Sequence, residues 1–184
     1  MSMGVLLYGP PAAGKSTITQ ALTSSDDRFQ LFRRLKVGRG RRTEYRMTTS
    51  TRLQQLREAG GIIWENTVYG ATYAVDRQEL SRMVASGVRP VIHLGQPEAV
   101  KVLLSHTSLT WLVVSLRCPR TVALARMSAR GTGDDHARMR VWDQTVIPPF
   151  NDLDVDTSVS TPEEAAALIR SALEEASVKS VVPG

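Results

Sequence analysis

A nine-residue segment near the N-terminus, GPPAAGKST, contains the residue types and spacing of a phosphate-binding loop. Gly9 and Gly14 bracket four residues and are followed by Lys15 and Ser16, which is the G-x-x-x-x-G-K-[ST] pattern. Small residues let backbone N–H groups approach a polyphosphate, and a helix starting at the loop adds its dipole. Lys15 would then reach the terminal phosphates, and the Ser16 hydroxyl would bind Mg²⁺. The predicted cofactor-binding residues are Gly9, Pro10, Pro11, Ala12, Ala13, Gly14, Lys15, Ser16 and Thr17.

The surroundings of this loop favour a nucleotide site over an ordinary strand–turn–helix with a basic residue at its start. An apolar strand pattern over residues 5–8 precedes the loop, and a helix pattern over residues 16–22 follows it. This is the context that the motif requires. We expect Lys15 to face solvent when the loop holds no nucleotide.

A second segment, residues 125–140, places arginines on both sides of a short polar loop. A helix pattern ends at Arg130, and arginines resume at Arg138 and Arg140 on the next helix. Phosphoryl transfer leaves the protein little covalent work, so catalysis rests on positioning and charge neutralisation. Arginines carried by a closing lid would supply both and would exclude water. The predicted catalytic residues are Lys15, Arg130, Arg138 and Arg140; the alternative is an exposed hairpin whose arginines form surface ion pairs.

Composition and charge limit the possible classes of protein. The 184 residues suffice for one domain, and 42% hydrophobic with 22% charged residues is typical of a globular chain. The net charge of +5 comes mainly from arginine, because only four of the 23 basic residues are lysine. Arginine binds phosphate oxygens bidentately, so a small anionic ligand accounts for this excess as well as a nucleic acid does. The single cysteine, Cys118, excludes an internal disulfide and is expected to be buried.

No long apolar span and no signal-peptide pattern follows Met1, so we expect a cytoplasmic protein without membrane association. We expect either a monomer or a homodimer.

The remainder of the chain alternates strand and helix patterns at the lengths of βαβ units. Apolar strand patterns occupy residues 5–8, 62–64, 90–94, 111–116 and 153–156, with helix patterns between them. This alternation predicts an α/β fold with a central, mostly parallel sheet flanked by helices and a ligand site at the carboxyl ends of the strands. Residues 33–46 are basic and show no clear period. Residues 1–176 are expected to form a single domain, and residues 177–184 a C-terminal tail.

Four segments together resemble guanylate kinase and related nucleoside monophosphate kinases, over about residues 4–175. They are GPPAAGKST, WENTVYGATYAV at 64–75, LRCPRTVALARMSARGTGDD at 116–135, and LDVDTS at 153–158 followed by a helix that starts PEEAA. The resemblance implies a P-loop kinase fold that uses ATP and Mg²⁺. It also implies a small acceptor-binding subdomain at about residues 33–75 and an arginine lid at about residues 130–140.

The resemblance further implies a set of acceptor-binding residues. Arg39 and Arg42 fall where arginines bind the acceptor phosphate, Tyr45 and Tyr73 where tyrosines contact it, and Glu65 where a carboxylate binds guanine. Turn or core packing is the alternative for Tyr73. A nucleic-acid patch is the alternative for the basic stretch, which the scarcity of lysines and the lack of interleaved aromatic residues disfavour.

The chain departs from the guanylate kinase pattern at two places. LKVGRGRR at 35–42 replaces the S-x-TTR-x-x-R acceptor signature, and HLGQ at 93–96 replaces the acidic residue expected after the middle strand. We expect His93 to be an ordinary strand residue, with a catalytic base as the alternative. The chain is also similar to the ribose bisphosphate phosphokinases of phosphonate metabolism. They have the same general arrangement of motifs and likewise depart from the guanine-binding pattern.

The leading hypothesis is transfer of the γ-phosphoryl group of ATP to a small phosphorylated acceptor, most simply a nucleoside monophosphate. One alternative is a kinase for a sugar phosphate, such as ribose bisphosphate, or for a specialised metabolite. A second alternative is a non-enzymatic nucleotide-binding or nucleic-acid-binding protein.

Overall fold

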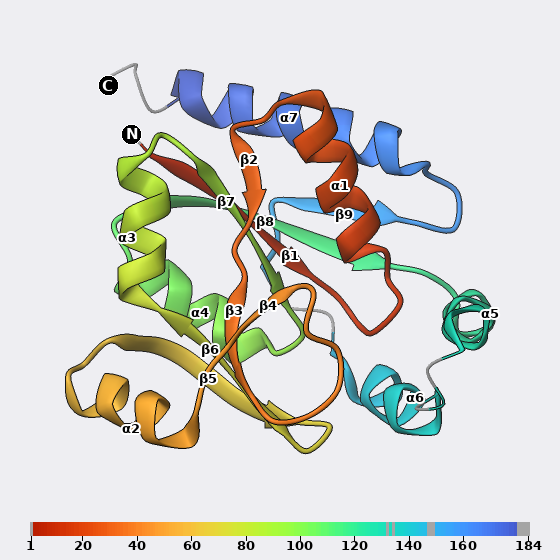
Figure 1. The fold of residues 1–184 in the computed structure, drawn as a ribbon. Helices are drawn as coiled ribbons and strands as arrows, with labels where there is room; N and C mark the ends of the chain where they lie inside the picture. The colour runs from red at the N-terminus through yellow and green to blue at the C-terminus, as the bar shows by residue number, and fades with distance from the viewer. Residues whose placement is uncertain (1, 132, 134, 147–149, 180–184) are drawn as a thin grey trace.

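A computed structural model describes residues 2–131, 133, 135–146 and 150–179, and its ribbon is drawn in Figure 1. The central sheet has five strands, all parallel, in the order β2–β7–β1–β8–β9. Their bounds are β1 Met3–Tyr8, β2 Phe29–Leu31, β7 Arg89–Leu94, β8 Thr110–Arg117 and β9 Leu153–Asp156. This arrangement confirms the predicted α/β fold with a central parallel sheet.

Helices cover both faces of the central sheet (Figure 1). Their bounds are α1 Lys15–Ser25, α3 Arg77–Ala85, α4 Pro97–His106 and α7 Pro162–Lys179. Every residue of β1 is buried, and its side chains alternate between two clusters. Val5 and Leu7 pack with α1 and α7, whereas Leu6 and Tyr8 pack with α3 and α4. Burial on both faces explains why β1 and β8 appear in the sequence as continuous apolar runs.

A second, four-stranded sheet lies beside the carboxyl ends of the first, in the order β4–β3–β6–β5. Its bounds are β3 Arg34–Val37, β4 Tyr45–Met47, β5 Ile62–Val68 and β6 Ala71–Asp76, and helix α2 spans Ser50–Glu58. One face of this sheet packs on α2 through Leu35, Leu53 and Ala74. Because side chains alternate along a strand, the neighbouring residues Arg34, Lys36 and Tyr73 face the other way. Residues 33–46, expected without regular structure, therefore supply two strands.

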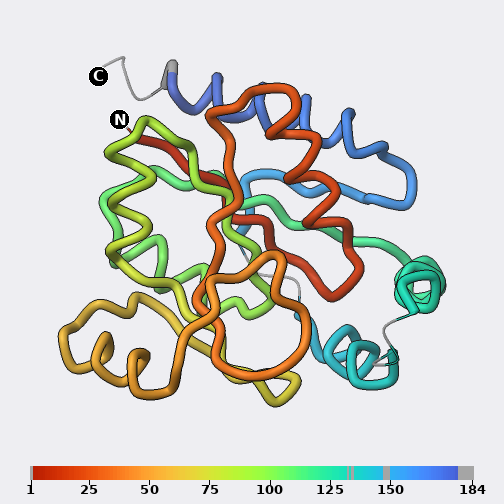
Figure 2. Tube along the Cα trace, in the orientation of Figure 1, coloured from red at the N-terminus to blue at the C-terminus, as the bar shows by residue number. Residues whose placement is uncertain are grey.

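Two further helices, α5 (Arg120–Arg130) and α6 (Asp135–Gln144), follow β8. The chain trace in Figure 2 shows them at the same end of the molecule as the loop between β1 and α1. Residues 132 and 134 of the expected lid lie outside the described residues. Arg120 pairs with Asp143 at 2.9 Å and joins the two helices.

The C-terminal helix is longer than expected. α7 continues to Lys179, so residues 177–179, which we expected in a tail, are helical, and residues 180–184 lie outside the described part of the chain. None of the helices within the described residues combines the length and apolar character needed to cross a bilayer.

Candidate active site

A cavity of about 590 Å³ lies between the phosphate-binding loop, the end of β7, the second sheet and the α5–α6 pair. It is at the carboxyl ends of β1 and β7, as the parallel sheet predicts. The loop contributes Gly9 and residues 11–16 to the wall, and Thr17 lines an adjoining hollow with Ser16. Pro10 is the one predicted loop residue that is absent from both walls within the described part of the chain.

Glycine is required at two positions of the loop. Gly14 precedes α1 with a φ of 96°, a left-handed conformation that disfavours other residues. A Cβ on Gly9 would lie 2.6 Å from the carbonyl oxygen of Leu116 at the end of β8. The loop therefore packs tightly against the sheet and directs the N-terminus of α1 toward the cavity, which is the geometry of an anion site.

Lys15 lies over the loop and is half-buried, so the expectation that it faces solvent is wrong. Its ammonium donates hydrogen bonds to the carbonyl oxygens of Gly9 and Pro10, the latter at 2.8 Å. Burial, with the charges of Arg34 and Arg130 nearby, lowers the pKa of Lys15 to about 7. The ammonium therefore lies in the cavity wall. Its hydrogen-bond partners among the described residues are neutral carbonyl oxygens, not anions.

The second sheet presents two tyrosines and two cations to the cavity. The ring centres of Tyr45 and Tyr73 lie 5.0 Å apart. The Lys36 ammonium lies 5.2 Å and 5.4 Å from the two ring centres, and the Arg34 guanidinium lies over both rings as well. Lys36 is only 2% exposed, donates to the carbonyl oxygen of Arg41 at 2.8 Å, and has its pKa lowered by burial and by Arg138. Sequence reasoning placed Tyr45 and Tyr73 but missed Arg34 and Lys36.

The loop between β3 and β4 adds further charge. Arg39 and Arg41 line the cavity, whereas Arg42 is exposed and lies outside its wall. Arg41 forms an ion pair with Glu44 at 3.0 Å. Glu44 is the only carboxylate among the described residues that line the cavity, against six arginine and lysine side chains besides Lys15.

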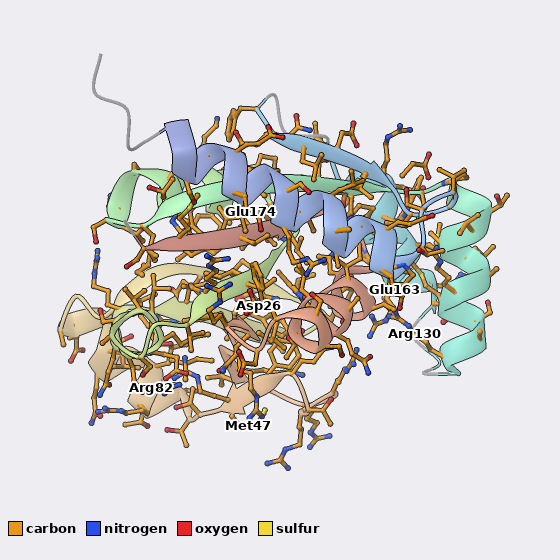
Figure 3. All side chains as sticks on the ribbon, turned by 90° about the horizontal axis from the view of Figure 1, so that it is seen from above. Asp26, Met47, Arg82, Arg130, Glu163 and Glu174 are labelled. Atoms are coloured by element: carbon orange, nitrogen blue, oxygen red, sulfur yellow. The ribbon has the colours of Figure 1, made fainter. Side chains whose placement is uncertain are left out.

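The α5–α6 pair brings two of its predicted arginines to the cavity. Figure 3 labels Arg130 beside the N-terminal end of α1, where it lines the same hollow as Ser16 and Thr17. Burial, then the charges of Arg41 and Arg138, lower the pKa of Arg130. Arg138 lies 5.6 Å from the ring centre of Tyr69, at the turn between β5 and β6. Arg140 is exposed on α6 and lies outside the cavity wall.

Arg126, which sequence reasoning also missed, ties α5 to the phosphate-binding loop. Its guanidinium donates to the carbonyl oxygen of Thr157 at 2.6 Å, to the Thr157 hydroxyl at 2.9 Å and to the carbonyl oxygen of Ala12 at 3.2 Å. Three bonds from one planar group hold α5 against the phosphate-binding loop and Thr157. Arg130, one turn later on the same helix, is positioned by this anchor.

Glu65 lies away from the cavity, on the α2 side of the second sheet. Its carboxylate pairs with Arg57 of α2 at 2.9 Å, and it is opposite Ala74, whose side chain packs on α2. The next residue, Asn66, lines the cavity instead and is opposite Tyr73. The alternation of β5 therefore brings an amide to the position where the resemblance implied a carboxylate.

His93, at the end of β7, also lines the cavity. Its Nε2 atom lies 2.7 Å from the Thr19 hydroxyl of α1. Burial, followed by the nearby charge of Lys15, lowers the pKa of His93 well below its usual value, so the ring is neutral near pH 7. It joins β7 to α1, in keeping with the role of a strand residue.

Comparison with known proteins identifies both the fold and the family. The fold is similar to that of guanylate kinase from Anaplasma phagocytophilum, with a TM-score of 0.65 and 16% identity over 95% of this chain and 85% of that one. It is also similar to a sugar kinase from a Janibacter species, with a TM-score of 0.57 and 16% identity over 95% of each chain. At these identities the likeness shows a common fold alone. No curated protein matches the chain.

Residues 2–174 match the family model described as chloramphenicol phosphotransferase-like protein. This match supports the predicted P-loop kinase family, whereas the narrower resemblance to guanylate kinase has only a likeness of fold behind it. The chain therefore belongs to the chloramphenicol phosphotransferase-like family of P-loop phosphotransferases.

Proposed function

We propose that the protein transfers the γ-phosphoryl group of ATP to a small phosphorylated acceptor, with a nucleoside monophosphate as the leading candidate. The observation that supports this proposal is the positive charge of the cavity wall. Among the described residues of the wall, seven are lysine or arginine and one, Glu44, is a carboxylate, which is already paired with Arg41. Two phosphorylated substrates held together bring several negative charges, which this wall would neutralise.

The same charge distribution favours a phosphate as the nucleophile. A hydroxyl acceptor must lose a proton during transfer, so it needs a general base within hydrogen-bond reach. A phosphate monoester is already ionised near neutral pH, because its second pKa is about 6. In the described cavity wall the candidate bases are Glu44, which is ion-paired, and His93, which is bonded to Thr19. Each candidate base is therefore already engaged by a neighbouring side chain, Glu44 through Oε1 and His93 through Nε2.

The donor side would hold ATP with Mg²⁺. The loop backbone and Lys15 would bind the β- and γ-phosphates, and Arg130 would approach from α5. The described residues contain no group of three or more His, Cys, Asp or Glu side chains that could hold a metal ion by themselves. Mg²⁺ commonly keeps several waters and binds through substrate phosphates, so the Ser16 hydroxyl and ATP oxygens fit it without a carboxylate cluster. When bound, the ion would neutralise charge on the phosphates.

A coupled assay of ADP release, run over nucleoside monophosphates, phosphosugars, free sugars and chloramphenicol, tests the proposal. We expect at least one monophosphate to turn over faster than any unphosphorylated acceptor. Faster turnover of an unphosphorylated acceptor would overturn the assignment of the acceptor phosphate. ATP binding without acceptor-dependent ADP release would instead indicate a non-enzymatic nucleotide-binding protein.

Transfer to a hydroxyl group is the second candidate, because the family description names a phosphotransferase for chloramphenicol. Glu44 is then the stronger candidate base, because the pKa of His93 is lowered well below its usual value, and the variant Glu44→Gln separates the two cases. For a phosphate acceptor we expect kcat to change less than about 3-fold, whereas loss of a general base costs ~10²-fold or more. Glu58→Gln on α2, outside the cavity wall, is the matched control.

The pKa of Lys15 makes ATP binding dependent on pH. The ammonium is partly deprotonated in the free protein above pH 7, and bound phosphates favour its charged form, so the complex holds more protons than the free protein. The affinity for ATP should therefore fall as pH rises above about 7. At about pH 8, binding of ATP should be accompanied by uptake of close to one proton by Lys15. Titration calorimetry in buffers of different ionisation enthalpy measures this uptake. It should disappear in Lys15→Arg, because arginine stays protonated, and equal uptake by both proteins would contradict the prediction.

A further inference from the structure

The side chain of Asn66 has a hydrogen-bonding capacity that no described residue uses. Its Oδ1 atom is buried and has no hydrogen-bond partner, although the residue lines the cavity. Buried polar atoms in folded proteins nearly always have a partner, and in a binding cavity a water or a ligand can supply the missing one. Trp64, two residues earlier on the same face of β5, packs against the core outside the cavity wall, and its buried Nε1 atom also has no hydrogen-bond partner among the described residues.

Asn66 lies in the part of the cavity that the second sheet lines, where we place the acceptor. It lies on β5 opposite Tyr73 of β6, which in turn lies opposite Lys36 of β3. These three side chains form a row across one face of the second sheet, and all line the cavity. The row runs from a buried cation, past the Tyr45–Tyr73 pair, to an amide. A ligand with a phosphate at Lys36 would place its other end against Asn66.

The chemistry of the amide sets what it can bind. A carboxamide offers an acceptor oxygen and a donor nitrogen side by side, and so forms a bidentate pair with an edge that carries a donor beside an acceptor. A carboxylate offers two acceptors and suits two adjacent donors instead. Val68 and the tyrosines supply apolar wall next to the amide. This combination of a flat apolar surface and one bidentate group suits a planar heterocycle.

We propose that Asn66 determines acceptor specificity by pairing with a heterocycle edge that has one N–H donor beside one acceptor, such as a lactam or an aminopyridine edge. This inference rests on the proposed function, because it takes the acceptor to be a phosphorylated heterocycle. Glu65, the adjacent carboxylate, takes no part, since it is paired with Arg57 on the opposite face of the sheet.

The test compares kcat/KM for AMP, CMP, UMP, IMP and GMP in the wild type, Asn66→Leu and Asn66→Asp. Leucine has the same branching at Cγ as asparagine, although it is larger, and removes both hydrogen bonds, so we expect at least a 10-fold loss for the preferred monophosphate. Aspartate pairs with two donors, so it should raise the ratio of GMP to IMP turnover at least 10-fold, because these substrates differ only in the 2-amino group. Ribose 5-phosphate, which has no base, should keep its inhibition constant within 3-fold in both variants.

The outcomes separate the two levels of the proposal. Turnover of no phosphorylated acceptor by the wild type would overturn the proposed function itself. Unchanged turnover of the preferred monophosphate in Asn66→Leu would overturn the inference about Asn66 alone. An equal loss for ribose 5-phosphate would also overturn it, because the substitution would then have disturbed the phosphate end. Thr67→Val is the matched control, since Thr67 is exposed and bonds to Thr72 outside the cavity wall.

Discussion

Replacing Lys15 with alanine is expected to lower the rate of phosphoryl transfer at least ~10²-fold. Its ammonium already lies inside the cavity wall, where it bonds to the carbonyl oxygens of Gly9 and Pro10. Phosphate oxygens entering the loop are stronger partners than carbonyls, so the charge would turn toward them as negative charge develops on the transferred group. The rate should be measured at saturating ATP, so that a loss of binding is not counted as a loss of catalysis.

The fold should survive this change. The lowered pKa of Lys15 means that the folded state disfavours its charged form, and alanine removes that cost below pH 7, where the ammonium is protonated in both states. Circular dichroism and a thermal melt check the fold directly. Near-normal turnover by a folded Lys15→Ala protein would show that the loop is not the donor site.

Replacing Arg130 with alanine is expected to lower kcat about 10²-fold while raising the acceptor KM less than about 3-fold. The guanidinium lies among Arg41 and Arg138, and burial with these like charges already lowers its pKa. A cation in such surroundings contributes most to kcat where negative charge develops in the transition state, as it does on the leaving oxygen. Steady-state kinetics with both substrates varied separate the two parameters.

Arg120→Ala provides the control for Arg130. Arg120 lies on the same helix but is exposed, outside the cavity wall, and joins α5 to α6 through Asp143. If both variants lose kcat equally, the effect arises from loosening of the helix pair. If Arg130→Ala changes only KM, the arginine contacts the ground state and is not catalytic.

The parts of the fold that burial controls could be predicted from the sequence. β1 and β8 are buried on both faces, so they appear as apolar runs. The phosphate-binding loop was equally clear, because its spacing is imposed by backbone geometry around the glycines.

The second sheet was harder to predict, because its strands are short and one face lines a polar cavity. In β3 the sequence Arg34-Leu35-Lys36-Val37 alternates with a period of two, yet its apolar side chains are few and its cations resemble those of a loop. That alternation was the available signal for Lys36, since it sets both cations on one face. Which of Glu65 and Asn66 faces the cavity depends on pairing between strands, and a motif comparison by position does not contain that information.

The pairing of β5 with β6 is irregular between Ile62 and Trp64, where the register shifts. The shift allows Ile62 to pack toward α2 while Trp64 and Asn66 face the other side. In a regular strand with Ile62 kept in place, Glu65 would face the cavity and Asn66 would face α2, because facing alternates with every residue. A one-residue insertion or deletion at this bulge would thus exchange an amide for an acid without changing either residue. In this family, we therefore expect a gap in an alignment near Ile62 to change which of the two residues faces the cavity.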